Sequence, residues 1–309
     1  MDDILKYSWD INTITKNYMT HSLEKGNKNI KIAVIDSGAD ITHPGLKENI
    51  VLKKNFVKNE SFYDYTGHGT MICGQIVGND LIKGIVPNCK IDVIKVLDKN
   101  NSCSFENFIS ALEYVYYNKY NVVNLSLGLS IKNKTNTELE YPFKLLKKLY
   151  DKGTVCVNSV GYLENSNVHF PSCSPYTFTA QSLSRNNEIV NSVLLGDYCL
   201  PSGDYFNTKL NELNDYDEYV TVFFPIEKSK ELKRKYPTQH NLPIGFLYSI
   251  GESLASAKLS GIIIAIISKY LNEHKYILSP KEISEILSKY SCSIEDRIYP
   301  DLYRILINI

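Results

Sequence analysis

The sequence has no excess of charge, because 34 Lys and Arg residues balance 34 Asp and Glu residues over 309 positions. A nucleic-acid or anionic-membrane partner is usually indicated by a basic surplus, so we expect neither. Long apolar runs are also lacking. The most apolar stretch, 259–271, is shorter than the roughly 20 residues that a membrane span needs, and we expect it to be a buried core helix.

The N-terminus contains no basic segment followed by an apolar run, so no signal peptide is visible and we expect a cytoplasmic protein. A secreted chain that had already been trimmed would look the same. Seven cysteines are scattered without the spacing of a metal site. Their odd number favours free thiols in a reducing compartment over a disulfide framework. We predict no bound metal and no cofactor.

Helical and strand patterns alternate along the chain. The apolar segment 30–35 lacks a period of two, which is typical of a strand buried on both faces of a parallel sheet. Strand 91–97, helix 104–117 and strand 122–128 follow one another as a βαβ unit. We therefore predict an α/β fold of three layers, with a mainly parallel sheet and helices on both faces, formed by a single domain over 1–309.

Three separate segments carry residues suited to nucleophilic catalysis. Asp36 follows the first strand, His68 stands between two glycines ahead of an apolar run, and Ser253 precedes the most apolar helix. A serine at a helix N-terminus lies where developing negative charge is favoured. Its hydroxyl attacks a carbonyl only with the help of a base and of a group that orients the base.

The order Asp, His, Ser, with the flanking residues in Asp36-Ser37-Gly38, Gly67-His68-Gly69-Thr70 and Gly251-Glu252-Ser253, resembles the subtilisin-like serine peptidase (subtilase) family. The resemblance implies a subtilisin-like fold in which Asp36 orients His68, His68 acts as the base and Ser253 is the nucleophile. Ser126-Leu127-Gly128 matches the family segment whose main chain pairs with an extended substrate. His43 has the simpler interpretation of a turn residue before proline.

The chain departs from the family at two places near this site. The family's oxyanion-binding asparagine aligns with Tyr162, and its threonine before the nucleophile aligns with Glu252. The phenol of Tyr162 could donate to the oxyanion, Asn165 or Asn158 could replace it, or the site could be impaired. Losing one such donor costs about 10²–10³ in turnover, so a slow peptidase survives the loss. Glu252 could perturb His68 or narrow the cleft.

Two further segments differ from the compact members of the family. The short stretch 78–83 lacks the residues for the calcium loop that many extracellular members have, and we predict no calcium there. The segment 204–243 is an unmatched insertion. Its charged part, 227–235, is either a solvated helix face or part of a flap that overhangs the cleft and selects the peptide.

The resemblance implies a serine endopeptidase that acts on a peptide or protein substrate through an acyl-enzyme. Members without a signal peptide or prosegment resemble intracellular subtilases, including those that remove leader peptides from lanthipeptide-type precursors, and this is the function we expect. The alternative is a catalytically impaired pseudopeptidase that binds a peptide or partner protein through the retained cleft. The sequence does not indicate the oligomeric state.

Overall fold

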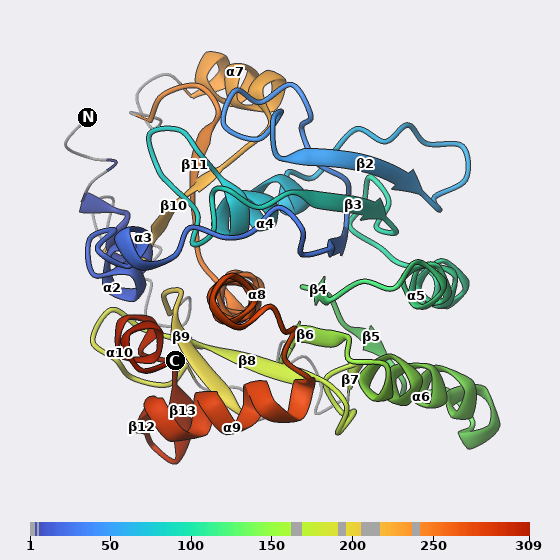
Figure 1. Ribbon diagram of the computed structural model, residues 1–309. Helices are drawn as coiled ribbons and strands as arrows, with labels where there is room; N and C mark the ends of the chain where they lie inside the picture. Colours follow the sequence, from blue (N-terminus) through green and yellow to red (C-terminus); the bar gives the residue numbers. More distant parts are fainter. Residues whose placement is uncertain (1–3, 5, 162–168, 191–195, 205–216, 237–241) are drawn as a thin grey trace.

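The computed structural model describes residues 4, 6–161, 169–190, 196–204, 217–236 and 242–309. A large sheet crosses the molecule, with helices on both of its faces (Figure 1). Its nine strands have the order β12-β13-β9-β8-β6-β4-β1-β3-β2. The pairs are parallel except for the antiparallel pair of β12 and β13 at one edge. This confirms the predicted α/β fold with a mainly parallel sheet.

The strands of this sheet are short and mostly buried. The bounds are β1 Ile32–Asp36, β2 Ile50–Asn55, β3 Ile91–Lys95, β4 Val122–Leu125, β6 Val155–Ser159, β8 Phe178–Leu183, β9 Tyr198–Pro201, β12 Cys292–Ile294 and β13 Arg297–Tyr299. All five residues of β1 are buried, as the missing alternation predicted. Two-stranded ladders form from β5 (Leu129–Ser130) with β7 (His169–Phe170), and from β10 (Val220–Phe223) with β11 (Phe246–Ser249).

Each face of the sheet has its own core. Ile32 and Val34 of β1 pack into the core that contains helices α4 (His68–Val77) and α8 (Glu252–His274). Ala33 and Ile35 point to the opposite face and pack with α5 (Phe105–Asn118) and α6 (Asn136–Asp151). Successive side chains of a strand thus point into two apolar layers. Both sets must be apolar, so the sequences of these strands are continuous hydrophobic runs.

Helix α8 lies in the middle of the first core, seen end-on in Figure 1, and packs on α4 and on β4, β6, β8 and β9. It is long and apolar enough to span a membrane by length and composition alone, yet 83% of its most apolar window is buried inside the molecule. The predicted buried core helix is therefore confirmed, and it extends beyond 259–271 in both directions.

The described part of the 204–243 insertion packs behind α4. Phe223 of β10 lies against the helix so closely that a Cβ at Gly74 would stand 2.4 Å from its ring. Helix α7 (Ile226–Lys235) follows, mostly exposed, with only Ser229 buried. The solvated-face interpretation of 227–235 fits this helix. The overhanging flap is not seen in the described residues, whose Phe223 and Phe224 pack against the helix that carries His68.

The chain ends pack on the same core. Helices α2 (Trp9–Thr15), α3 (Thr20–Leu23), α9 (Pro280–Tyr290) and α10 (Leu302–Asn308) complete the fold. Ser279 caps α9 with Pro280 at the first helical position, as its sequence predicted. Trp9 packs on the core and donates its indole N–H to the carbonyl of Tyr219 at 3.1 Å. The seven cysteines are all free.

Candidate active site

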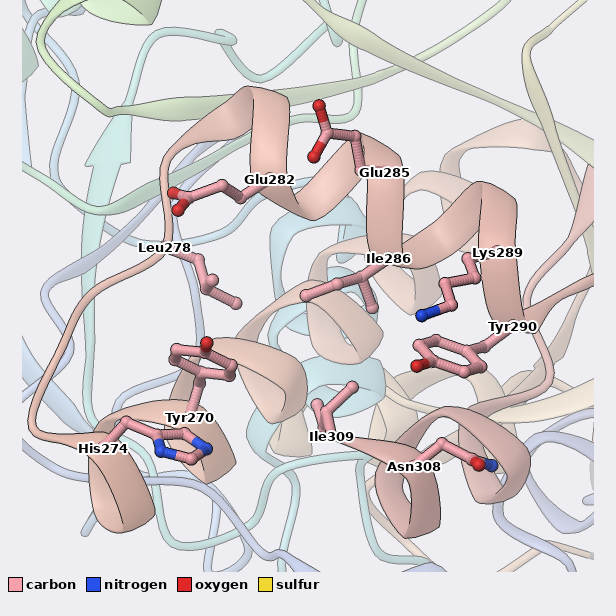
Figure 2. Close-up of a pocket in the computed structure, with 10 residues that line it drawn as sticks. All are labelled: Tyr270, His274, Leu278, Glu282, Glu285, Ile286, Lys289, Tyr290, Asn308 and Ile309. Carbon is pink, nitrogen blue, oxygen red and sulfur yellow. The ribbon is translucent and has the colours of Figure 1, made fainter.

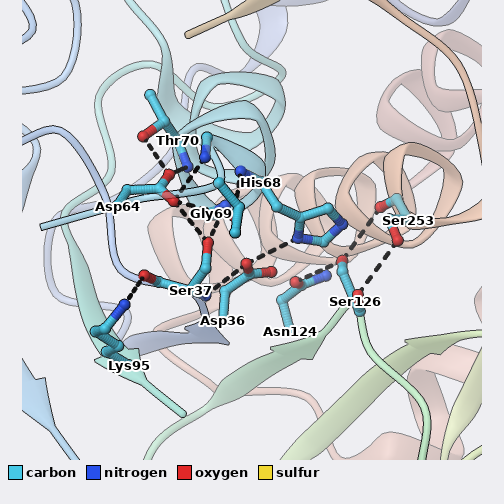
Figure 3. Close-up of polar contacts among 12 residues, drawn as sticks. Asp36, Ser37, Asp64, His68, Gly69, Thr70, Lys95, Asn124, Ser126 and Ser253 are labelled. Carbon is cyan, nitrogen blue, oxygen red and sulfur yellow. Dashed lines mark hydrogen bonds and ion pairs between the residues drawn. The ribbon is translucent and has the colours of Figure 1, made fainter. Parts of the chain in front are cut away.

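Asp36 and His68 form the first contact of the site. Asp36 stands at the carboxyl end of β1 with its side chain fully buried, and its Oδ1 accepts a hydrogen bond from His68 Nδ1 at 2.8 Å (Figure 3). Burial lowers the pKa of His68, but the charge and hydrogen bond of Asp36 outweigh burial and raise that pKa above its ordinary value. The carboxylate thereby fixes the imidazole with Nδ1 protonated and Nε2 free to accept a proton.

A second buried carboxylate, Asp64, holds the start of α4 in place. Its two oxygens accept hydrogen bonds from the backbone N–H groups of Gly67 and Thr70, both at 2.8 Å, and from the Ser37 hydroxyl at 2.8 Å. These bonds join the helix that begins with His68 to the loop that follows Asp36. At Gly69 a Cβ would stand 1.9 Å from the carbonyl oxygen of Gly38, so only glycine permits this approach.

Ser253 is the second residue of α8, where the backbone N–H has no acceptor inside the helix. Its Oγ donates to the main-chain oxygen of Ser126 at 3.2 Å, and among the described contacts none joins it to His68. Behind it, the hydroxyls of Ser126 and Ser256 are 2.7 Å apart, and Ser256 Oγ donates to the Ser253 carbonyl. Asn124 Nδ2 donates to Ser260 Oγ at 3.0 Å, so the end of β4 is bonded to α8 along two turns.

These residues meet at a cavity of about 440 Å³. Its described lining brings together the predicted site residues His68 and Ser253 with the predicted substrate segment Ser126-Leu127-Gly128. The remaining described residues that line it are Leu97, Asn101, Cys103, Leu129, Ser159, Gly161 and His169. No residue of the 204–243 insertion is among them.

Two of the candidate oxyanion donors, Tyr162 and Asn165, lie outside the described residues, so their roles stay predictions. Asn158 is buried in β6, and its amide donates to Thr179 Oγ1 at 3.3 Å and to the carbonyl of Ser159. It is not part of the described cavity lining. In this structure the amide of Asn158 is thus bonded within the sheet, and its role as a replacement donor stays a prediction.

Glu252 neither lines the cavity nor acts on His68. Its carboxylate is 2% exposed and turns away from the cavity to accept a hydrogen bond from the backbone N–H of Ser182 in β8. Burial raises the pKa of Glu252 to about 8. The residue links α8 to β8 next to Ser253. His43, as expected, is a structural residue whose ring is bonded to Gly245 and Gly45.

A second hollow, of about 460 Å³, lies at the opposite end of α8, between that helix, α9 and α10 (Figure 2). Its polar groups already have structural roles. Glu282 completes the capping box of α9, and the rings of Tyr270 and His274 are in tilted contact with centroids 4.3 Å apart. Within the described ranges, no three His, Cys, Asp or Glu side chains gather closely enough to hold a metal ion.

Sequence reasoning missed several residues that build the site: Asp64, Asn124, Ser256 and His169. Ser256 stands three residues after Ser253, and a polar residue so close to a candidate nucleophile could have been examined for a partner. Asp64 gave no signal, because its partners are brought together only by the fold. Asn124 precedes the predicted substrate segment by two residues, but its bond to Ser260 could not be read from the sequence. His169 looked like a polar residue before a Phe-Pro pair.

Comparison with known proteins supports this description. The chain matches the Subtilase family, Peptidase S8, over residues 27–297. The major intracellular serine protease of Bacillus subtilis is 39% identical over 110 residues, which are 33% of this chain and 34% of the relative. The first curated relatives are thus covered over about a third of their length or less.

Two solved structures resemble nearly the whole chain. A lanthipeptide protease superposes with a TM-score of 0.85 at 23% identity, covering 99% of this chain and 96% of the other. The nisin leader peptidase NisP from Lactococcus lactis gives 0.80 at 20% identity, covering 97% and 93%. At these identities the likeness establishes the fold. Together with the match over residues 27–297, it places this chain in the subtilase family of serine peptidases.

Proposed function

We propose that this chain is a serine endopeptidase in which Asp36, His68 and Ser253 act as the catalytic triad. The observation that supports this best is the 2.8 Å bond from His68 Nδ1 to the buried Asp36 carboxylate, with His68 and Ser253 lining one cavity. His68 is oriented by a buried carboxylate and faces a cavity that it shares with a serine at a helix N-terminus. Such an arrangement fits the activation of a hydroxyl.

The reaction follows from these positions. Ser253 Oγ bonds to the carbonyl carbon of the scissile peptide while its proton passes to His68 Nε2. The Ser253 backbone N–H, which has no helical acceptor, donates to the resulting oxyanion, with Tyr162 as the proposed second donor. His68 then gives its proton to the leaving amine as the C–N bond breaks. Water cleaves the acyl-enzyme by the same route and returns the proton to Ser253.

The Ser253 hydroxyl donates to the Ser126 carbonyl, and a bound substrate can change this hydrogen bond. A substrate strand paired with residues 126–128 offers its own N–H groups to main-chain oxygens of that segment. A substrate N–H that donates to the Ser126 oxygen competes with the Ser253 hydroxyl for this acceptor and weakens its present bond. His68 Nε2 is the base on the same cavity, so substrate pairing favours the reactive orientation of the nucleophile.

The proposed substrate is a peptide precursor from which a leader segment is removed. Support comes from the two neighbours named above, whose descriptions are a lanthipeptide protease and a nisin leader peptidase. An intracellular serine protease among the curated relatives supports the proposal that the reaction occurs in the cytoplasm. Leader removal needs recognition of one bond in one peptide, so we propose a narrow specificity.

The second candidate is a peptide-binding protein without turnover. It is favoured by the bond that holds Ser253 Oγ on Ser126 and by Tyr162 at the position of the family's asparagine. In this case the cavity would bind a peptide without cleaving it.

Intact-protein mass spectrometry after incubation with an alkyl fluorophosphonate separates the two candidates. The native chain is expected to gain one probe adduct, and Ser253→Ala is expected to gain none. Ser22→Ala, which alters an exposed serine on α3, is the matched control and should label like the native chain. Weaker labelling of Tyr162→Phe would assign the phenol as an oxyanion donor. A folded native chain that stays unlabelled would refute the peptidase.

A further inference from the structure

Lys95 ends strand β3 beside Asp36, and the mechanism above gives it no role. The two residues are partners in the parallel ladder of β1 and β3, and both side chains are fully buried. Among the described residues, Lys95 and Lys258 are the only lysines or arginines whose side chains are fully buried. Burying an ammonium group costs free energy unless the group is paired and hydrogen-bonded, so the contacts of Lys95 call for an explanation.

The two buried ammonium groups are bound in different ways. Lys258 Nζ lies 2.7 Å from a buried carboxylate, whereas the carboxylate oxygen beside Lys95 Nζ, Glu60 Oε2, is 3.6 Å away. The shorter contacts of Lys95 are to main-chain carbonyls. Its Nζ donates to the carbonyl of Ser37 at 2.7 Å and to that of Tyr63 at 3.3 Å. This ammonium therefore joins two loops and does not form a tight ion pair.

The two carbonyls that the ammonium binds lie next to the two carboxylates that organise the site. Ser37 directly follows Asp36, the residue that is bonded to His68. Tyr63 directly precedes Asp64, which holds the start of α4 through the backbone N–H groups of that helix. Because one ammonium is bonded to both loops, it fixes the distance between the two carboxylates.

Ser37 connects this contact to the histidine. Its backbone N–H donates to Asp36 Oδ1 at 2.7 Å, and the same oxygen accepts the hydrogen bond from His68 Nδ1. Its hydroxyl donates to Asp64 Oδ1 at 2.8 Å. Its carbonyl is the group that Lys95 binds (Figure 3). A displacement of Ser37 therefore moves an N–H that holds the carboxylate against the imidazole.

We propose that Lys95 is a positioning residue, whose ammonium keeps the Asp36 carboxylate against His68 by holding the two loops together. Lys95 is not part of the described lining of the cavity, so it acts through Ser37. This inference rests on the proposed function and adds the residue that secures the pair of base and carboxylate. Loss of the ammonium slows the chemical step and leaves binding in the cavity unchanged.

The test measures how fast an alkyl fluorophosphonate modifies Ser253 in the native chain, in Lys95→Met and in Lys95→Gln, over a range of probe concentrations. Methionine has a similar length without a charge or a donor, and glutamine is shorter and neutral but keeps an amide donor. We expect the maximal rate of modification to fall about 10- to 100-fold in Lys95→Met, with an unchanged probe concentration at half-maximal rate. Lys95→Gln should lose less, and it replaces Lys95→Met if that variant does not fold.

A control variant and a second measurement separate positioning from a general loss of stability. Leu146→Ala opens a cavity in the core on the other face of the sheet, so it should lower the melting temperature and still react at the native rate. Proton NMR detects the Nδ1 proton of His68 at low field because it is bonded to Asp36. This signal should move upfield or disappear in Lys95→Met and stay in place in Leu146→Ala.

The outcomes distinguish the inference from the proposed function. A folded Lys95→Met or Lys95→Gln that reacts at the native rate, or that keeps the native low-field signal, overturns the positioning role while the peptidase stands. The same conclusion follows if Leu146→Ala slows the reaction as much as Lys95→Met does. A folded native chain that the probe does not label overturns the proposed function, and this inference with it.

Discussion

A buried ion pair between α2 and α8 offers a quantitative test of the fold around the nucleophile. Lys258 Nζ lies 2.7 Å from Asp10 Oδ2, and both side chains are fully buried. The ammonium also donates to Ser202 Oγ at 3.2 Å. Burial lowers the pKa of Lys258, and the charge of Asp10 opposes that shift. Replacing Asp10 by Asn keeps the shape and removes the compensating charge.

The loss of unfolding free energy expected for Asp10→Asn has an upper limit, because Lys258 can release its proton. A buried cation without its partner costs about 3–5 kcal/mol. The chain can avoid that cost by releasing the proton, which at pH 7 requires about 5 kcal/mol for a group with an ordinary pKa near 10.4. We therefore expect Asp10→Asn to lower the free energy of unfolding by about 3–5 kcal/mol at pH 7.

The pH dependence of this loss identifies its cause. In Asp10→Asn the folded state disfavours the protonated lysine, so the unfolded state binds more protons and stability rises with pH, by up to about 1.4 kcal/mol per unit. Urea unfolding followed by circular dichroism should show that the difference in unfolding free energy between the native chain and Asp10→Asn is smaller at pH 9 than at pH 7. At pH 9 it should be about 1–2 kcal/mol. Asp151→Asn, which breaks an exposed pair with Lys147, is the matched control and should change little.

Two results would refute the reasoning. One is an Asp10→Asn variant as stable as the native chain at pH 7. The other is a deficit that stays constant up to pH 9, which would mean lost packing and not an uncompensated charge. The double variant Asp10→Leu/Lys258→Met should recover most of the stability, since a hydrophobic pair of similar volume removes the buried charge altogether.

Three further predictions concern the surroundings of the site. Burial raises the pKa of Glu252 from 4.5 to about 8, so the free energy of unfolding of the native chain should fall as pH rises between these two values. Glu252→Gln removes the titrating group, so its urea midpoint should exceed that of the native chain by an amount that grows over the same pH range. Asp64 contributes to the raised pKa of His68, so Asp64→Asn should move the acid limb of the kcat/KM profile to lower pH, and an unmoved limb would exclude this contribution. Gly74→Ala should cost about 1–3 kcal/mol in thermal unfolding because its Cβ meets Phe223, and Phe223→Leu should relieve that cost.

Those parts of the fold that depend on local patterns could be predicted from the sequence. Buried strands such as β1 appear as β-branched runs, and α9 carries its cap, its proline and its acidic first turn within four residues. The boundaries moved slightly where the signal was weak. Helix α4, for example, begins at His68 itself and includes the two residues before the apolar run, which we expected from Thr70 onward, and the residue before it, Gly67, has a left-handed conformation.

The contacts that position the site could not be predicted in this way. Asp64 acts through Ser37 and the start of α4, and the Asp10–Lys258 pair joins residues almost 250 positions apart in the chain. No periodicity or short motif encodes such a meeting. His169 is a further case, because its closeness to Gly128 and Gly161 arises only in the fold.

The position of α8 also determines the order in which this protein can become active. The helix fills the core beside β4, β6, β8 and β9, and its first turn carries Ser253. During synthesis, Asp36, His68 and the segment 126–128 leave the ribosome long before residues 252–274 do. Until then the sheet lacks the apolar layer that buries one of its faces, and contacts so distant in sequence form slowly. Ser253 thus arrives together with the helix that completes one of the two cores, and a partly made chain lacks both that helix and Ser253.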